Sequence, residues 1–219
     1  MQQESTIMNN SVTLVGEIVS DYSYSHEVYG EGFYTVNVNV LRLSDVSDIL
    51  PVTISERILD RNKFCIGAKV VISGQIRSYN NFLESDKKNR LILTVFARDI
   101  HLFSEESANK NPNDVFLNGY ICKKPVYRTT PFGREIVDLL LAVNRSYNKS
   151  DYIPCIAWGR NARFGGKLEV GDNLKIWGRM QSRKYQKKIG EDEIIEKTAY
   201  EVSVCKMEIP EVTVEEDTE

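Results

Sequence analysis

The chain has 219 residues, of which 42% are hydrophobic and 27% are charged, and its formal net charge is -3. This is the composition of an ordinary globular protein with one or two domains. It excludes a membrane-spanning helix, because no run of about 18 apolar residues occurs, and the amino terminus lacks the features of a secretion signal. We therefore expect a cytoplasmic protein with no membrane partner.

The charge is unevenly distributed along the chain. Residues 1–112 carry 11 Lys and Arg against 14 Asp and Glu, and residues 113–209 carry 17 against 12, a net charge of +5. Residues 210–219 hold five acidic residues and no basic one. Any polyanionic partner is therefore expected to bind the second half, and the acidic tail is expected to be disordered.

The two halves resemble each other. "NNSVTLVGEI" at 9–18 matches "PNDVFLNGYI" at 112–121, an offset of 103 residues. "GAKVVISGQIRS" at 67–78 matches "GDNLKIWGRMQS" at 171–182, an offset of 104. A period this long is that of a duplicated domain and not of a solenoid.

The repeat predicts a domain at 9–104, a polar linker "EESANKNPND", a second domain at 113–209 and a tail at 210–219. In the first domain, "KVVISGQIRSY" alternates as a strand does, which places Val70, Ile72, Gly74 and Ile76 in the core and leaves Gln75, Arg77 and Tyr79 outside.

The second domain reads as all-β. Its apolar segments are separated by turn signals such as "TTPFG" and "NKSD", and they lie at 115–121, 135–147, 151–158, 172–186 and 198–208. A short helix fits only in "GRNARFGG", between the third and fourth segments. This order is typical of the OB-fold, a partly open Greek-key barrel of five strands. We predict an all-β protein of two tandem OB-fold barrels with a disordered acidic tail.

The fourth segment, 172–186, together with the stretch "KIWGRMQSRKYQKK" at 175–188, has two distinct faces. Its inner set is Leu174, Ile176, Gly178 and Met180, and its outer set is Trp177, Arg179, Gln181, Arg183 and Tyr185. Two neighbouring segments also place aromatic residues outside: Tyr147 beside Arg145, and Tyr152 and Trp158 with Ile156.

This mixture of rings and cations matches the needs of single-stranded nucleic acid. Unpaired bases stack on aromatic rings, and the phosphates between them are neutralised by Lys or Arg. A duplex cannot use the rings, because its bases are already stacked. The alternative is structural: Trp177 alone would more often be a packing residue, and "RKYQKK" a solvated face. The repetition over three strands favours binding.

The second domain resembles the bacterial single-stranded DNA-binding proteins. The resemblance runs from Val115 to Met207 and rests on G-x-I-x-x-x-P, "TPFG", "AVNR", "WGRNA" and "GRMQSRKY". It implies nonspecific binding of single-stranded DNA in replication, recombination or repair, without catalysis. It also implies that the stacking rings are Tyr147, Tyr152, Trp158 and Tyr185.

The first domain departs from the family pattern. The residues at its matching positions are Ser44, Ile49, Ser55 and Asn81, none of them aromatic. A weaker second DNA site or a subunit contact would explain this, and we favour the contact. The family brings about four OB-folds together, which a chain with two reaches as a homodimer. The tail "EEDTE" lacks the apolar tip by which the family docks on replication proteins, so recruitment of such partners stays open.

No pattern for catalysis, metal or cofactor binding occurs. Only two His are present, neither in the basic domain, and no P-loop or metal-ligand spacing appears. Cys65, Cys122, Cys155 and Cys205 stand singly in apolar runs and are expected to be buried free thiols. We expect neither enzymatic activity nor a cofactor.

The sequence thus predicts a protein that coats single-stranded DNA with its second domain. The alternatives are a primosomal accessory or RNA-binding OB module, and an OB-fold subunit-interaction scaffold without a nucleic-acid role. The predicted DNA-binding residues are Arg128, Arg145, Tyr147, Tyr152, Trp158, Trp177, Arg179, Arg183, Tyr185 and Lys187.

Overall fold

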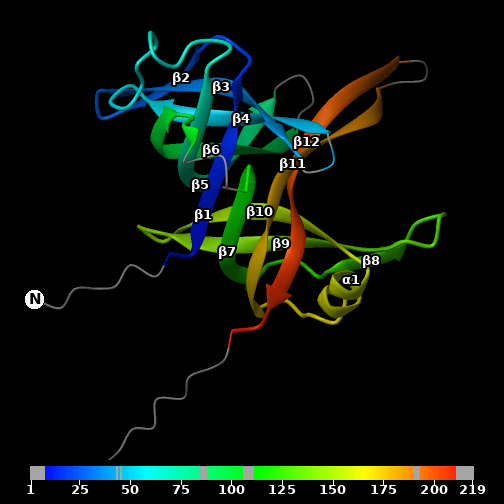
Figure 1. The fold of residues 1–219 in the computed structure, drawn as a ribbon. Coiled ribbons are helices and arrows are strands. Elements are labelled where there is room, and N and C mark those ends of the chain that lie inside the picture. The colour runs from blue at the N-terminus through cyan, green and yellow to red at the C-terminus, as the bar shows by residue number, and fades with distance from the viewer. Residues whose placement is uncertain are drawn as a thin grey trace, which may run out of the picture.

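The computed structural model describes residues 8–42, 44, 46–83, 88–105, 111–189 and 193–210. Within these residues the strands form one continuous sheet in the order β2-β3-β4-β6-β5-β1-β7-β11-β12-β10-β9-β8. The sheet closes twice on itself, through the pairings β3–β1 and β7–β9, and so makes two barrels. Figure 1 shows the first barrel above the second.

The first barrel is built from the amino-terminal half of the chain. Its strands are β1 (Asn10–Ile18), β2 (Ser23–Val28), β3 (Glu31–Leu41), β4 (Ser47–Ser55), β5 (Lys69–Leu83) and β6 (Lys88–Leu102). The alternation expected in β5 is confirmed, because Val70, Ile72 and Ile76 are fully buried.

The second barrel repeats the arrangement and adds a helix. Its elements are β7 (Asn113–Ile121), β8 (Val126–Thr129), β9 (Glu135–Arg145), β10 (Lys149–Trp158), α1 (Arg160–Gly165), β11 (Asn173–Ile189) and β12 (Glu193–Glu208). The five expected strands and the short helix between the third and fourth are confirmed. The short edge strand β8 was not expected, nor was its counterpart β2, which is exposed along its whole length. Tyr147 lies in the turn after β9 and not in the strand itself.

The hydrophobic core follows from the two-residue period of the strands. Leu117, Leu141, Ile153, Leu174 and Ile176 are fully buried inside the second barrel. Each barrel is completed by one parallel contact, β4 with β6 and β10 with β12. The remaining barrel pairings are antiparallel, as in a Greek key.

Strands β1 and β7 join the two barrels edge to edge. They pair antiparallel, with Val12 opposite Val115. At the end of each strand an asparagine occupies an equivalent place: the side chain of Asn10 exchanges two hydrogen bonds with the backbone of Ile76, and that of Asn113 does the same with Met180. The duplicated sequence therefore folds into two copies related by an approximate two-fold axis.

A bulge interrupts the long hairpin of each barrel at matching positions. The register shifts at Ser73/Gly74 in the first barrel and at Trp177/Gly178 in the second. Glycine is required at Gly74 and Gly178 because a Cβ atom would collide with a carbonyl oxygen of the partner strand. The extra residues are Arg98 in β6 and Cys205 in β12.

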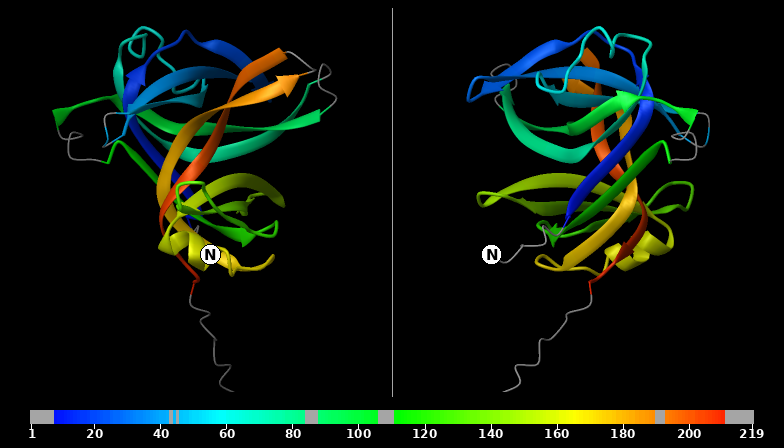
Figure 2. Two further views of the ribbon diagram at one scale, coloured as in Figure 1. Left: turned by 90° about the vertical axis from the view of Figure 1, so that its right-hand side faces the viewer. Right: turned by 60° about the vertical axis from the view of Figure 1, so that its left-hand side comes forward.

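The two long hairpins, β5–β6 and β11–β12, extend beyond their own barrels. Strand β5 packs on β10 of the second barrel, and β11 packs on β4 of the first. Figure 2 shows the orange β11–β12 hairpin rising along the first barrel. Residues of both barrels are therefore held side by side where the hairpins cross.

The cysteines are free, as expected, but only Cys155 is buried, while Cys65 and Cys205 are exposed, so the prediction of four buried thiols was wrong. Residues 106–110 of the expected linker and the tail 211–219 lie outside the described residues. In the described ranges, no helix has the length and apolar character to cross a membrane.

Candidate nucleic-acid interface

Strand β10 places two rings on the outer face of the second barrel. Tyr152 and Trp158 are 45% and 42% exposed, and between them Pro154 and Ile156 keep the same side of the strand. Strand β10 pairs with β9, and β9 pairs with β8 along its other edge. These three strands form a surface, which we call the stacking face, on which flat apolar groups remain partly open to solvent.

Tyr147 stands at one end of this face. It lies in the three-residue turn between β9 and β10, and its side chain is 94% exposed. Its φ of 63° is in the left-handed region, which is uncommon for a residue with a large side chain. The turn therefore holds a tyrosine ring in solvent at some conformational cost, which is a feature typical of functional sites.

Arg128 lies at the other end of the stacking face. It is directly across from Ile136, which in turn is opposite Trp158, so the three side chains form one row over β8, β9 and β10. Its guanidinium donates hydrogen bonds of 3.0 and 3.3 Å to the carboxylate of Asp138. Because a guanidinium has five N–H donors, this ion pair leaves donors for a phosphate and fixes their direction.

Arg145 ends β9 next to the turn that carries Tyr147. Its guanidinium lies 3.7 Å from the carboxylate of Asp151, which is 1% exposed. The same carboxylate forms a 2.9 Å ion pair with the guanidinium of Arg77 of the first barrel. One buried carboxylate therefore positions two arginines from different barrels.

Arg183 and Tyr185 line a groove of about 460 Å³ where the two hairpins cross. Pro154 of the stacking face and Tyr79 of the first barrel line the same groove. The guanidinium of Arg183 lies 5.9 Å from the ring centre of Tyr185 and 3.6 Å from Glu201. The groove continues the stacking face toward the first barrel.

The structure does not bring Trp177 into this set. Its ring packs on Phe116 of β7, with 5.2 Å between ring centres, and Lys206 lies 4.4 Å above it. Arg179, on the same side of β11, lines a separate cavity with Asp114. Trp177 and Arg179 were predicted together with Arg183 from strand parity alone, but only Arg183 lines the groove where the hairpins cross. The side chain of Lys187 lies outside the described residues.

Two rings near the interface were missed by sequence reasoning, and a third, Tyr79, was predicted only to lie on the outside of the first barrel. Tyr120 of β7 is 47% exposed and pairs with Ala142 of β9. Ala142 also pairs with Tyr152 of β10, so the two tyrosines lie on either side of Ala142 in one row. Phe132 is 92% exposed in the turn between β8 and β9. The outward parity of Tyr120 and the turn signal "TPFG" could have indicated both. Tyr79 could be placed only by the crossing of the hairpins.

The chemistry of this surface is that of binding. It offers open rings for stacking, with arginines at its ends and along its groove. Among the described residues, no group of three or more His, Cys, Asp or Glu is placed to hold a metal ion. Burial raises the pKa of the Cys155 thiol, which therefore stays protonated in the core.

Comparison with known proteins identifies the second barrel. The model of the Single-strand binding protein family matches residues 112–210. Single-stranded DNA-binding protein 1 of Staphylococcus aureus (strain COL) is 36% identical over 85 residues, which are 36% of this chain and 51% of that protein. Single-stranded DNA-binding protein A of Bacillus subtilis (strain 168) is 34% identical over 86 residues, with shares of 36% and 50%. The chain thus spans about half the length of these curated relatives.

The two-barrel arrangement is found in a solved structure. The wild-type single-stranded DNA binding protein from Thermus aquaticus superposes with a TM-score of 0.72 at 21% identity, covering 92% of this chain and 93% of that one. This similarity extends the fold to the first barrel, which the family match does not reach. The chain is a tandem OB-fold protein whose second barrel, within residues 112–210, matches the model of the Single-strand binding protein family.

Proposed function

We propose that this protein binds single-stranded DNA nonspecifically through its second barrel and coats it during replication, recombination or repair. The observation that carries the proposal is the stacking face, which lies wholly within the family-matched residues and leaves Tyr147, Tyr152 and Trp158 open to solvent. The curated relatives of this chain are named single-stranded DNA-binding proteins.

Bases stack on the rings of the stacking face in this mechanism. Each stacked base contributes about 1–3 kcal/mol, with little dependence on which base it is. Tyr185 takes a further base in the groove beside Arg183. Since stacking needs an open π-face, paired bases of a duplex are excluded.

Arginines neutralise the phosphates that connect these bases. Arg128 lies in the same row as Trp158, with Ile136 between them, and Arg145 comes two residues before Tyr147. The guanidinium of Arg183 lies 5.9 Å from the ring centre of Tyr185. The carboxylate partners of these arginines, Asp138, Asp151 and Glu201, fix the guanidinium positions before DNA arrives. We place Arg179 and Trp177 outside the groove and keep Lys187 as a contact to be tested.

We further propose that two chains assemble into a homodimer with four OB-folds. The pairing of β1 with β7 merges strands β6, β5, β1, β7, β11 and β12 into one broad outer face. Val15, Phe116 and Trp177 lie on this face and are only partly buried within one chain. A second copy would cover these side chains and would explain why Trp177 points away from the stacking face.

The proposal is tested by equilibrium titration with fluorescently labelled oligo(dT) and with a duplex of equal length, each at low and high salt. The proposal predicts tight binding of the single strand, much weaker binding of the duplex, and an affinity for the single strand that falls with salt. Equal affinity for both forms would indicate a general polyanion surface and would contradict stacking.

A further inference from the structure

Two seams run between the barrels, one on each side of the β1–β7 pair, and the approximate two-fold axis relates them. The first seam is a hollow of about 350 Å³ whose lining includes Asn9, Arg77, Arg98, Asn144, Arg145 and Ser146. The second seam, of about 380 Å³, is lined by Arg42, Arg179 and Cys205, which match Arg145, Gln75 and Arg98 of the first seam, and also by Asp114, among others. The two are equivalent in backbone but differ in charge.

The charge difference follows from the lining residues and the buried aspartates behind them. In the first seam Arg77, Arg98 and Arg145 face one carboxylate, that of Asp151, which leaves a net charge of about +2. In the second seam two arginines face two carboxylates, those of Asp48 and Asp114, and the net charge is about zero. An anion is therefore attracted to the first seam and not to the second.

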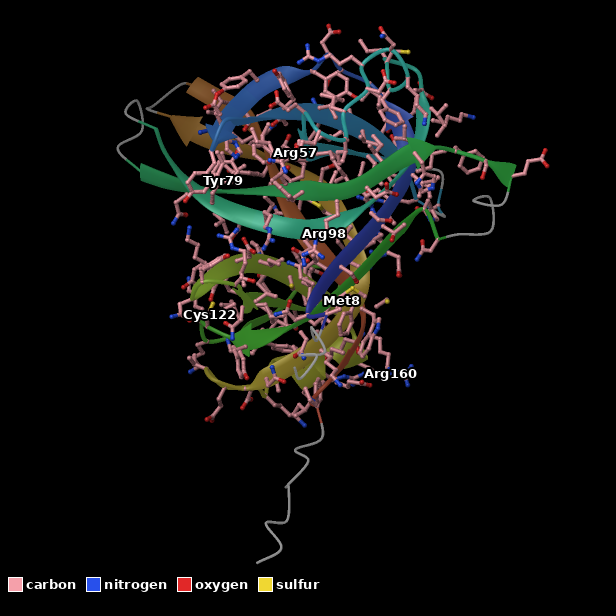
Figure 3. All side chains as sticks on the ribbon, turned by 90° about the vertical axis from the view of Figure 1, so that its left-hand side faces the viewer. Met8, Arg57, Tyr79, Arg98, Cys122 and Arg160 are labelled. Atoms are coloured by element: carbon pink, nitrogen blue, oxygen red, sulfur yellow. The ribbon has the colours of Figure 1, made fainter. Side chains whose placement is uncertain are left out.

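Arg98 supplies one of the two charges in this difference, and Asp114, which lines only the second seam, supplies the other. Arg98 is the extra residue of the β6 bulge, where Ser73 pairs with Asp99 and Gly74 pairs with Ala97. It therefore has no partner on β5, and the alternation of side chains along β6 is interrupted at this residue. Its counterpart in the second barrel is Cys205. Arg98 is exposed, and in the part of the chain that the structure describes its guanidinium has no ion pair or hydrogen bond. Figure 3 shows Arg98 on the first barrel where it faces the second, near Met8.

The first seam is continuous with rings on both barrels. On the second barrel it reaches Ser146, which directly precedes Tyr147 of the stacking face. Toward the first barrel, Arg77 and Arg145 line a further groove of about 680 Å³. Its lining from the first barrel includes Tyr79, Phe96 and His26. Tyr79 in turn lines the groove that holds Tyr185. The seam therefore lies between two ring-bearing surfaces.

We propose that the first seam is a phosphate-binding site for the backbone of single-stranded DNA, formed jointly by the two barrels. A strand stacked on Tyr147 passes Arg145, places phosphates against Arg77 and Arg98, and continues onto the first barrel beside Phe96 and Tyr79. The strand crosses on this side only, because the second seam offers no net positive charge. This inference rests on the proposed function of the second barrel.

The test uses the full-length protein with the substitution Arg98→Gln, which removes a charge without removing a hydrogen bond or ion pair among the described residues. Because an OB-fold covers about 4–16 nucleotides, oligo(dT) of about 8 nucleotides engages the second barrel alone and oligo(dT) of about 30 spans both. We expect Arg98→Gln to weaken the long oligonucleotide about fivefold and to lower its salt slope by about 0.7, with the short one unchanged.

Two control variants separate position from charge. Arg160→Gln removes an exposed arginine at the start of α1, away from both seams, and is expected to bind both oligonucleotides as the parent protein does. The double variant Arg98→Gln/Cys205→Arg restores the total charge but moves the guanidinium to the second seam, and it is expected to stay weak. Recovery of affinity in this double variant would overturn the inference, as would an unchanged Arg98→Gln. If the parent protein binds neither oligonucleotide, the proposed function itself fails instead.

Discussion

The backbone N–H of Ser78 donates a 2.8 Å hydrogen bond to Asp151, a buried carboxylate that belongs to the other barrel. The mirror contact joins Ser182 to Asp48, also at 2.8 Å. Ser78 is bound a second time, since its Oγ accepts a 2.7 Å hydrogen bond from the backbone of Tyr152. The strand that carries the stacking face is therefore anchored on the first barrel, which gives that barrel a role in positioning the site.

We expect Asp151→Asn to destabilise the protein more than a surface substitution does. The change leaves Arg77 and Arg145 without their shared carboxylate, and loss of one partner of a buried ion pair costs about 3 kcal/mol. The free energy of unfolding, measured by urea denaturation, checks this. The exposed pair Arg128–Asp138 provides the control, because Asp138→Asn should cost less than about 1 kcal/mol. Equal costs for the two variants would contradict the account.

The stability that Asp48 provides is expected to depend on pH. Burial alone would raise the pKa of Asp48, but hydrogen bonds from Arg42 and Ser182 outweigh it and hold the pKa below its ordinary value. A depressed pKa stabilises the fold above the pKa of the unfolded chain, about 3.9, and this contribution is lost as the pH falls further.

Comparison of the parent protein with Asp48→Asn checks the sign of this effect. The difference in their free energies of unfolding should be largest at neutral pH and should shrink as the pH is lowered below about 4. A difference that stays constant over this range would show that the charge of Asp48 does not contribute.

Removal of two rings from the stacking face is expected to abolish most DNA binding and to leave the fold intact. Tyr147→Asn suits the positive φ of that turn, since asparagine tolerates it, and Tyr152→Ala removes the neighbouring ring. At about 1–3 kcal/mol per stacked base, the double variant should lose at least about thirtyfold in affinity. Its thermal unfolding midpoint, taken by circular dichroism, should stay within a few degrees. A large fall in that midpoint would identify the rings as structural.

The homodimer makes a prediction about Phe116. The substitution Phe116→Glu places a charge in the Phe116–Trp177 pair. By light scattering the variant should have the mass of one chain, whereas the parent protein should have the mass of two. The matched control is Phe132→Glu, which makes the same change on an exposed turn and should leave the dimer intact. A parent protein of one-chain mass, or a variant that still dimerises, would contradict the assembly.

Much of the fold could be predicted because it follows from local alternation. The core positions Leu174, Ile176 and Met180 are buried as strand parity requires, and the repeat of "VTLVGEI" in "VFLNGYI" identifies two copies. The edge strand β8 was missed because "VYRT" is exposed throughout and carries no apolar alternation.

The site was predicted less completely because parity does not say which neighbour a side chain meets. Trp177 and Arg183 share a face of β11 in sequence, yet one packs on β7 and the other lines the groove between the hairpins. Arg98 could not be recognised at all, since its direction is set by a bulge. The contact of Ser78 with Asp151 depends on how the hairpins cross, which no local pattern encodes.

The two tryptophans, one on the stacking face and one away from it, give the most direct measurement of where DNA binds. Trp177→Phe leaves Trp158 as the only tryptophan, and Trp158→Phe leaves Trp177. On titration with oligo(dT) we predict strong fluorescence quenching for the protein that keeps Trp158, reduced at high salt, and little for the protein that keeps Trp177. Quenching of Trp177 alone, or of neither while DNA is bound, would contradict binding at the stacking face.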